Sequence, residues 1–173
     1  MSSYRQVLRG LGVASLLAAT AVALSACQVR PLYGNMAGTE RSISISEADT
    51  RVEQLVRNDL VFAFSGGSGE PANPAYRMDL DVRVIKQGVL AAGANDEFTA
   101  ARMLVIGRYA MVDAATGQTL FTGERRAVSQ VDNPDQEFAN VRAERDAENR
   151  AAREAAAFLN ADIFTLLYKG EVV

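Results

Sequence analysis

The 173-residue sequence contains no histidine, no tryptophan and a single cysteine, Cys27. The lack of histidine excludes Ser–His–Asp and Cys–His nucleophilic sites, and one cysteine without histidine cannot build a His- or Cys-ligated zinc site. One cysteine also excludes a disulfide within the chain. The sequence therefore indicates a binding, anchoring or structural protein, or an enzyme that uses only carboxylates and hydroxyls.

The chain also lacks a strong excess of either charge, with 18 Lys and Arg residues against 21 Asp and Glu residues. No large basic field is available for nucleic acid, so we expect no nucleic-acid partner. Asp79 and Asp81 are two residues apart on a predicted strand, so their side chains share one face, and Arg77 and Arg83 flank them. We interpret this pair as a solvated strand face, and we expect no catalytic residues and no metal.

The N-terminal segment has the organisation of a secretory signal. Arg5 and Arg9 precede an uncharged stretch, residues 10–29, whose centre reads LGVASLLAATAVAL. A basic start, a short apolar region and small residues at its end are typical of a cleaved signal peptide. The alternative is an uncleaved membrane helix, since about 20 apolar residues can span a bilayer.

The sequence Leu24-Ser-Ala-Cys27 resembles the lipobox of bacterial lipoproteins, and it holds the only thiol of the chain. The resemblance implies a signal peptide at residues 1–26 and a mature start at Cys27, which carries diacylglycerol and an N-acyl chain. Several acyl chains would hold the protein firmly on a membrane. Gln28, rather than Asp, follows the cysteine, which resembles an outer-membrane sorting signal. We expect no other cofactor.

After a tether ending at residue 40, one domain is predicted over residues 41–173. Residues 41–46 alternate polar and apolar types with period 2, as a short half-buried strand does. Ser46 is the expected N-cap of a helix whose apolar stripe runs from Val52 to Phe64. The glycine-rich segment 65–71 ends that helix.

Three further strands are predicted. The first begins at Tyr76. Apolar and charged residues alternate along it, which predicts that the side chain of Leu80 points into the core. A turn at residues 91–96 leads to the hairpin strands 102–113 and 119–131.

The hairpin register depends on the loop that contains Gly117. If Asp113 opposes Gln118, then Arg108 and Arg125 share one face. Both faces of the hairpin are then substantially apolar, and such a sheet needs cover on two sides. Three alternatives stay open: one face meets a partner, each helix covers one face, or the assumed register is off by one residue.

The final helix is predicted from the cap Asn133 and Pro134 to about Tyr168, with a charged first half and an apolar second half. The order β-α-β-β-β-α predicts an α+β fold. We expect a two-layer sandwich of about four mostly antiparallel strands with two helices.

The sequence Cys27-Gln-Val-Arg-Pro-Leu-Tyr-Gly34 resembles the start of the LptE lipoprotein family in its alphaproteobacterial form. The matching residues are Arg30, Pro31, Leu32, Tyr33 and Gly34. Gln28 and Val29 replace the usual Gly-Phe. The resemblance implies a protein without catalysis at the periplasmic side of the outer membrane. It would assemble and plug the LptD β-barrel and help to deliver lipopolysaccharide (LPS) to the cell surface.

A site for LPS should combine cations for its phosphates with apolar groups for its acyl chains. The candidate residues are Arg108 and Arg125, followed by Arg83, Lys86 and Arg126. Three alternative functions stay open at this point. They are an accessory lipoprotein of an ABC-type lipid transporter, a periplasmic activator of cell-wall synthesis, and a lipid-anchored hydrolase that uses Asp79 and Asp81.

The anchor can be tested by replacing Cys27 with alanine. Cys27→Ala should leave an unprocessed precursor, because no other thiol can accept the lipid. Mass spectrometry of the wild-type protein should detect an acylated peptide that begins at Cys27. An unmodified Cys27, or a mature start elsewhere, would contradict the lipoprotein prediction.

Overall fold

The computed structural model describes residues 42–92, 97–132 and 136–168. The expected signal peptide, Cys27, the motif at residues 30–34 and the tether lie outside these ranges. So do most of the turn before the hairpin and the expected cap at Asn133 and Pro134. Within the described residues the elements are β1 (Ile43–Ile45), α2 (Arg51–Ser65), β2 (Tyr76–Ala92), β3 (Glu97–Asp113), β4 (Thr119–Asp132) and α3 (Glu137–Tyr168). The predicted order β-α-β-β-β-α and the α+β class are confirmed.

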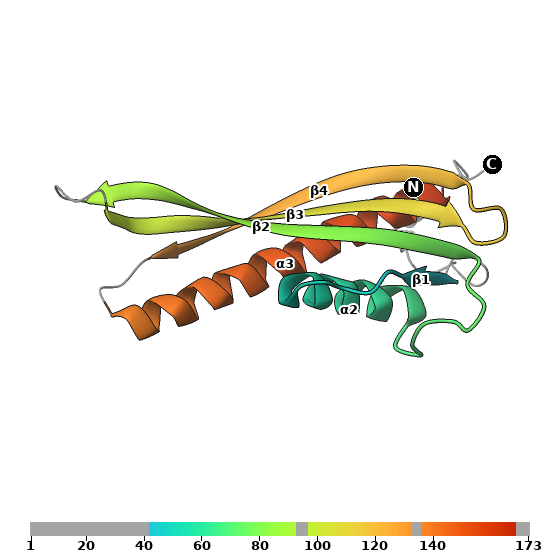
Figure 1. Cartoon of the computed structure of the whole chain (residues 1–173), viewed down its shortest axis with the longest axis horizontal. Helices are drawn as coiled ribbons and strands as arrows, with labels where there is room; N and C mark the ends of the chain where they lie inside the picture. The colour runs from blue at the N-terminus through green and yellow to red at the C-terminus, as the bar shows by residue number, and fades with distance from the viewer. Residues whose placement is uncertain (1–41, 93–96, 133–135, 169–173) are drawn as a thin grey trace, which may run out of the picture. The chain divides into compact units, whose positions relative to one another are not determined.

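The strands form one sheet in the order β1-β2-β3-β4. The chain passes from β1 through α2 to β2, and this crossover makes β1 parallel to β2. The pairs β2–β3 and β3–β4 follow directly in sequence and are antiparallel. Both helices lie on the same side of the sheet, with α3 running beneath the long strands and α2 beside it (Figure 1). The expectation of cover on two sides is therefore not met by the described residues.

The hairpin register differs from the prediction because β4 contains a bulge. Val112 pairs with Thr119 as expected, but Met111 pairs with Phe121, so Leu120 is an extra residue in β4. A shift of one residue exchanges the two faces of a strand. From Phe121 onwards, every β4 side chain therefore points to the face opposite the predicted one.

The N-cap of helix α2 lies four residues later than predicted. Thr50 is the N-cap, and its hydroxyl accepts a hydrogen bond from the Glu53 amide at 3.2 Å. Ser46 instead extends the β1–β2 pairing, since its amide donates to the Met78 carbonyl and its hydroxyl accepts from the Leu80 amide. Ser46 was a plausible cap because its hydroxyl can accept a hydrogen bond from a backbone amide. The amide that it binds, that of Leu80, belongs to the sheet.

The core lies between the helices and one face of the sheet. Met78, Leu80 and Val82 of β2 are buried there, as the period-2 pattern predicted. The centre of α3 packs through small residues that are almost completely buried, namely Ala147, Ala151, Ala152, Ala155 and Ala156. A β-carbon on Gly107 would lie 2.7 Å from the Leu159 side chain, so glycine is needed where α3 approaches β3 most closely.

The apolar second half of α3 docks on the sheet as predicted, with Leu159, Ile163 and Phe164 buried. Phe164 also meets Phe64 of α2 edge to face, with ring centroids 5.4 Å apart. The charged first half packs as well on its uncharged side, because Ala147 joins a cluster with Met103 of β3.

Leu80 and Ile85 offer a matched test of the two faces of β2. Leu80 is 8 % exposed towards the helices and Ile85 is 41 % exposed on the other face. Leu80→Ala should lower the free energy of unfolding by about 2–5 kcal/mol, because it leaves a cavity in the core. Ile85→Ala should cost less than about 1 kcal/mol. Urea unfolding of both variants measures the difference, and equal losses would mean that the core side of β2 is misassigned.

Candidate functional site

The sheet face that points away from the helices, called here the outer face, is the surface with the most evident binding chemistry. Its side chains form rows across β2, β3 and β4, because paired residues of neighbouring strands share a face. One row holds Arg83, Ile106 and Arg126. The next row is entirely apolar and holds Ile85, Leu104 and Val128.

The apolar row is open to solvent at both ends. Ile85 is 41 % and Val128 is 47 % exposed, and no described segment covers them. Ile106 in the neighbouring row is only 8 % exposed although it lies on the same face. Arg83 and Arg126 flank it in register, so the aliphatic parts of these long side chains can shield it. The outer face thus places cations directly beside exposed hydrophobic surface.

A network of ion pairs joins the arginines of the outer face. Arg108 Nε lies 2.6 Å from Glu124 Oε2, and Arg126 Nη2 lies 2.6 Å from Glu124 Oε1. Arg83 Nε lies 3.2 Å from Asp81 Oδ2, and Arg108 Nη1 lies 3.8 Å from the same oxygen. Hydrogen bonds from Arg126 and then Arg108 hold the pKa of Glu124 below its usual range. Three guanidinium groups therefore share two carboxylates, those of Asp81 and Glu124.

An open groove of about 560 Å³ lies along the carboxylate side of this network. Its floor is formed by small residues, Ala110, Thr122 and Gly123, and Arg108 and Glu124 border it. Asp79 and Asp81 also line the groove. Asp81 already pairs with arginines, which agrees with a solvated face. Among the described residues, no group of three or more Asp, Glu, His or Cys side chains is arranged to hold a metal ion.

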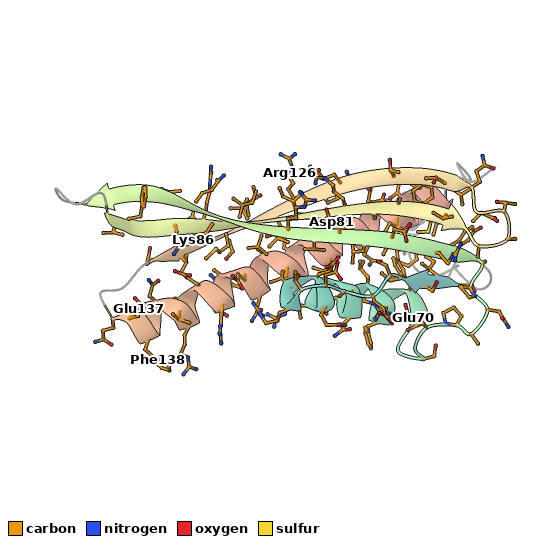
Figure 2. The ribbon with its side chains drawn as sticks, in the orientation of Figure 1. Glu70, Asp81, Lys86, Arg126, Glu137 and Phe138 are labelled. Carbon is orange, nitrogen blue, oxygen red and sulfur yellow. The ribbon has the colours of Figure 1, made fainter. Side chains whose placement is uncertain are left out.

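The structure divides the five predicted LPS-binding cations between the two faces. Arg83, Arg108 and Arg126 share the outer face, whereas Lys86 and Arg125 point towards the helices. Figure 2 shows Arg126 projecting away from the helix layer and Lys86 lying on the helix side. The prediction that Arg108 and Arg125 lie on one face is wrong, because the bulge at Leu120 was not foreseen.

Lys86 and Arg125 tie the sheet to α3 instead. Lys86 forms an ion pair with Glu144, and Arg125 forms one with Asp162. Asp162 also accepts a hydrogen bond of 2.7 Å from the Tyr109 hydroxyl. Arg125 is therefore part of a contact between the two layers, in which Arg125 and the buried Tyr109 bind the same carboxylate, that of Asp162.

Tyr109 occupies a space that only glycine on the neighbouring strand permits. A β-carbon on Gly123 would lie 2.5 Å from the Tyr109 ring. Phe121 meets the same ring edge to face, with centroids 6.1 Å apart. Burial, and then the hydrogen bond to Asp162, raise the pKa of Tyr109 well above its ordinary value of 10.0.

No family model and no curated protein matches the chain. Among solved structures, the chain resembles a protein from Caulobacter crescentus CB15 that is assigned as a lipoprotein. The two share 25 % sequence identity and a TM-score of 0.60 over 75 % of this chain and 93 % of the other. A minor lipoprotein from Acinetobacter baumannii gives a TM-score of 0.57 at 11 % identity, over 73 % and 92 % of the two chains.

The rare lipoprotein B from Shewanella oneidensis aligns with a TM-score of 0.46 at 16 % identity, over 76 % of this chain and 95 % of the other. The first likeness supports a lipoprotein role for this chain, and the second agrees in fold. No helix among the described residues is both long and apolar enough to cross a membrane. A lipoprotein role agrees with the lipobox-like sequence at Cys27.

The raised pKa of Tyr109 predicts a pH dependence of stability. The folded protein keeps the phenol proton at pH values where the unfolded chain has lost it. The contribution of this group is therefore complete below pH 10 and is lost as the pH rises above 10. In urea unfolding series from about pH 8 to about pH 11, wild type should lose stability more steeply than Tyr109→Phe. Parallel curves for the two proteins would contradict the assignment.

Proposed function

We propose that this chain is an outer-membrane lipoprotein that assembles and plugs an LPS-export β-barrel and helps to deliver LPS to the cell surface, as the LptE family does. The main support for the proposal is the outer face, which no described segment covers and where arginines adjoin an exposed apolar row. The family-like motif after Cys27 and the lipoprotein likeness support the same function.

The chemistry of the outer face suits a phosphorylated amphiphile. Guanidinium groups bind phosphate oxygens through charge-assisted hydrogen bonds, and their planar donors match two oxygens at once. Arg83, Arg108 and Arg126 would contact the phosphates of LPS. The adjacent row of Ile85, Leu104 and Val128 would contact acyl chains.

A plug must also meet the wall of its barrel with surface that the ligand does not use. The helix layer exposes large apolar side chains, namely Phe62, Phe138, Val141 and Phe158. Figure 2 shows Phe138 pointing away from the sheet, so it is available to a partner. Exposed aromatic groups are enriched at protein interfaces, and we assign these positions to contact with an LptD-like barrel.

Affinity purification of the tagged protein from detergent-solubilised outer membrane tests the partner. Recovery of an outer-membrane β-barrel supports the proposal. Recovery of an inner-membrane ATPase complex would instead favour the accessory lipoprotein of a lipid transporter, and recovery of a cell-wall synthase would favour the activator.

Arg108 and Arg126 provide the test of the ligand. Arg108→Ser combined with Arg126→Ser should lower the affinity for purified LPS by at least about tenfold, because two charge-assisted contacts are lost. Arg108 is 47 % and Arg126 is 62 % exposed, so the loss of these ion pairs should lower the melting temperature only slightly, with a further small loss because Arg126 no longer shields Ile106. LPS capture at low and at moderate salt measures the affinity.

The matched control removes two arginines from the helix layer. Arg142→Ser combined with Arg145→Ser changes the net charge by the same amount and leaves the outer face intact. It should capture LPS as wild type does. Capture that survives the outer-face change at both salt levels rejects this site, and equal loss in both double variants would mean that only the overall charge matters.

A further inference from the structure

Glu124 has an unusual place for an acid on a surface that is proposed to bind phosphate. It lies on β4 two residues before Arg126 and directly opposite Arg108 of β3. Its side chain is 29 % exposed, which is less than that of any other member of the outer-face ion-pair network. A negative charge at the centre of an anion site repels the ligand, so its presence needs a physical reason.

The geometry supplies that reason, because each carboxylate oxygen of Glu124 holds a different arginine. Oε2 accepts from Arg108 Nε at 2.6 Å. Oε1 accepts from Arg126 Nε at 2.7 Å and lies 2.6 Å from Arg126 Nη2. The two guanidinium groups come from adjacent strands and are fixed side by side by one carboxylate.

Fixing these side chains in advance favours ligand binding. A free arginine side chain samples many rotamers, and part of this freedom is lost when it binds a ligand. Because Arg108 and Arg126 bind Glu124 in the folded protein, their side chains are already ordered before a ligand binds. Because guanidinium has five N–H donors, Arg108 and Arg126 keep donors for a phosphate after binding Glu124. The gain from ordering two arginines opposes the repulsion by one carboxylate.

We propose that Glu124 is a positioning residue that clamps Arg108 and Arg126 into a paired site for a phosphate group. This inference rests on the proposed function for the identity of the ligand, LPS. The clamp and simple electrostatics predict opposite changes in ligand affinity when Glu124 is removed. Removal of an acid beside a phosphate site should strengthen binding through charge alone, whereas loss of the clamp weakens it.

The experiment uses the full chain in detergent with purified LPS as the probe. Glu124→Gln should weaken LPS capture by about two- to fivefold, despite the loss of a negative charge. Glu124→Asp keeps the charge and one or both contacts, so it should recover part of the affinity. Asp132→Asn is the matched control, since Asp132 lies on β4 on the same face and forms no ion pair with a described residue. It should bind LPS as wild type does, or slightly more tightly.

A background variant tests whether Glu124 acts through the arginines. In a chain that already carries Arg108→Ser and Arg126→Ser, Glu124→Gln should cause no further weakening. Unchanged or stronger capture by Glu124→Gln in the wild-type background overturns the clamp. Equal weakening in the two backgrounds also overturns it, because the effect would then bypass the arginines.

A measurement without ligand separates the clamp from the proposed function. Relaxation of the arginine Nε–H NMR signals should show that Glu124→Gln makes Arg108 and Arg126 more mobile. Arg102, whose Nε donates to Gln87 at 2.7 Å, should not change. Unchanged mobility of Arg108 and Arg126 overturns the clamp. Increased mobility in a protein whose wild-type form captures no LPS supports the clamp and overturns the proposed ligand.

Discussion

The packing of α3 against one face of the sheet is the constraint on which the rest of the structure depends. Five buried alanines allow close packing along α3, and Gly107 gives the space in which Leu159 reaches the sheet. Because α2 packs beside α3 on the same side, nearly all of the buried hydrophobic side chains of the described residues lie on that face, with Ile106 an exception (Figure 1). The outer face is consequently left to other interactions, although it carries its own apolar row.

The bulge at Leu120 then decides which charges lie on each face. Without it, Arg125 would share the outer face with Arg108, and Glu124 and Arg126 would point to the helices. With it, Arg125 reaches Asp162 of α3, while Glu124 and Arg126 join Arg108. One inserted residue thus supplies both the interlayer contact at Tyr109 and the ion-pair network of the outer face.

The two faces use the same residue types for different physical purposes. Arg125 and Lys86 bind carboxylates of α3 and connect the layers. Arg83, Arg108 and Arg126 bind carboxylates on the sheet itself, and their exposed guanidinium groups keep N–H donors that point to solvent. Under the proposed function, this difference leaves the outer face, and not the helix side, available to a phosphorylated ligand.

The sequence by itself determined the order of elements, the core side of β2 and the end of α3, because hydrophobic periodicity reports directly on which residues leave water. It also indicated Arg83, Arg108 and Arg126 as candidate cations, but not their grouping. A bulge leaves no local signature in the sequence around Leu120. The cap at Thr50 does have one, because Thr50-Arg-Val-Glu53 is a capping-box pattern, but Ser46 and Asp49 form a similar pattern four residues earlier. Which face the helices cover, and hence which arginines stay exposed, was decided by tertiary packing, because it depends on contacts between segments far apart in the chain.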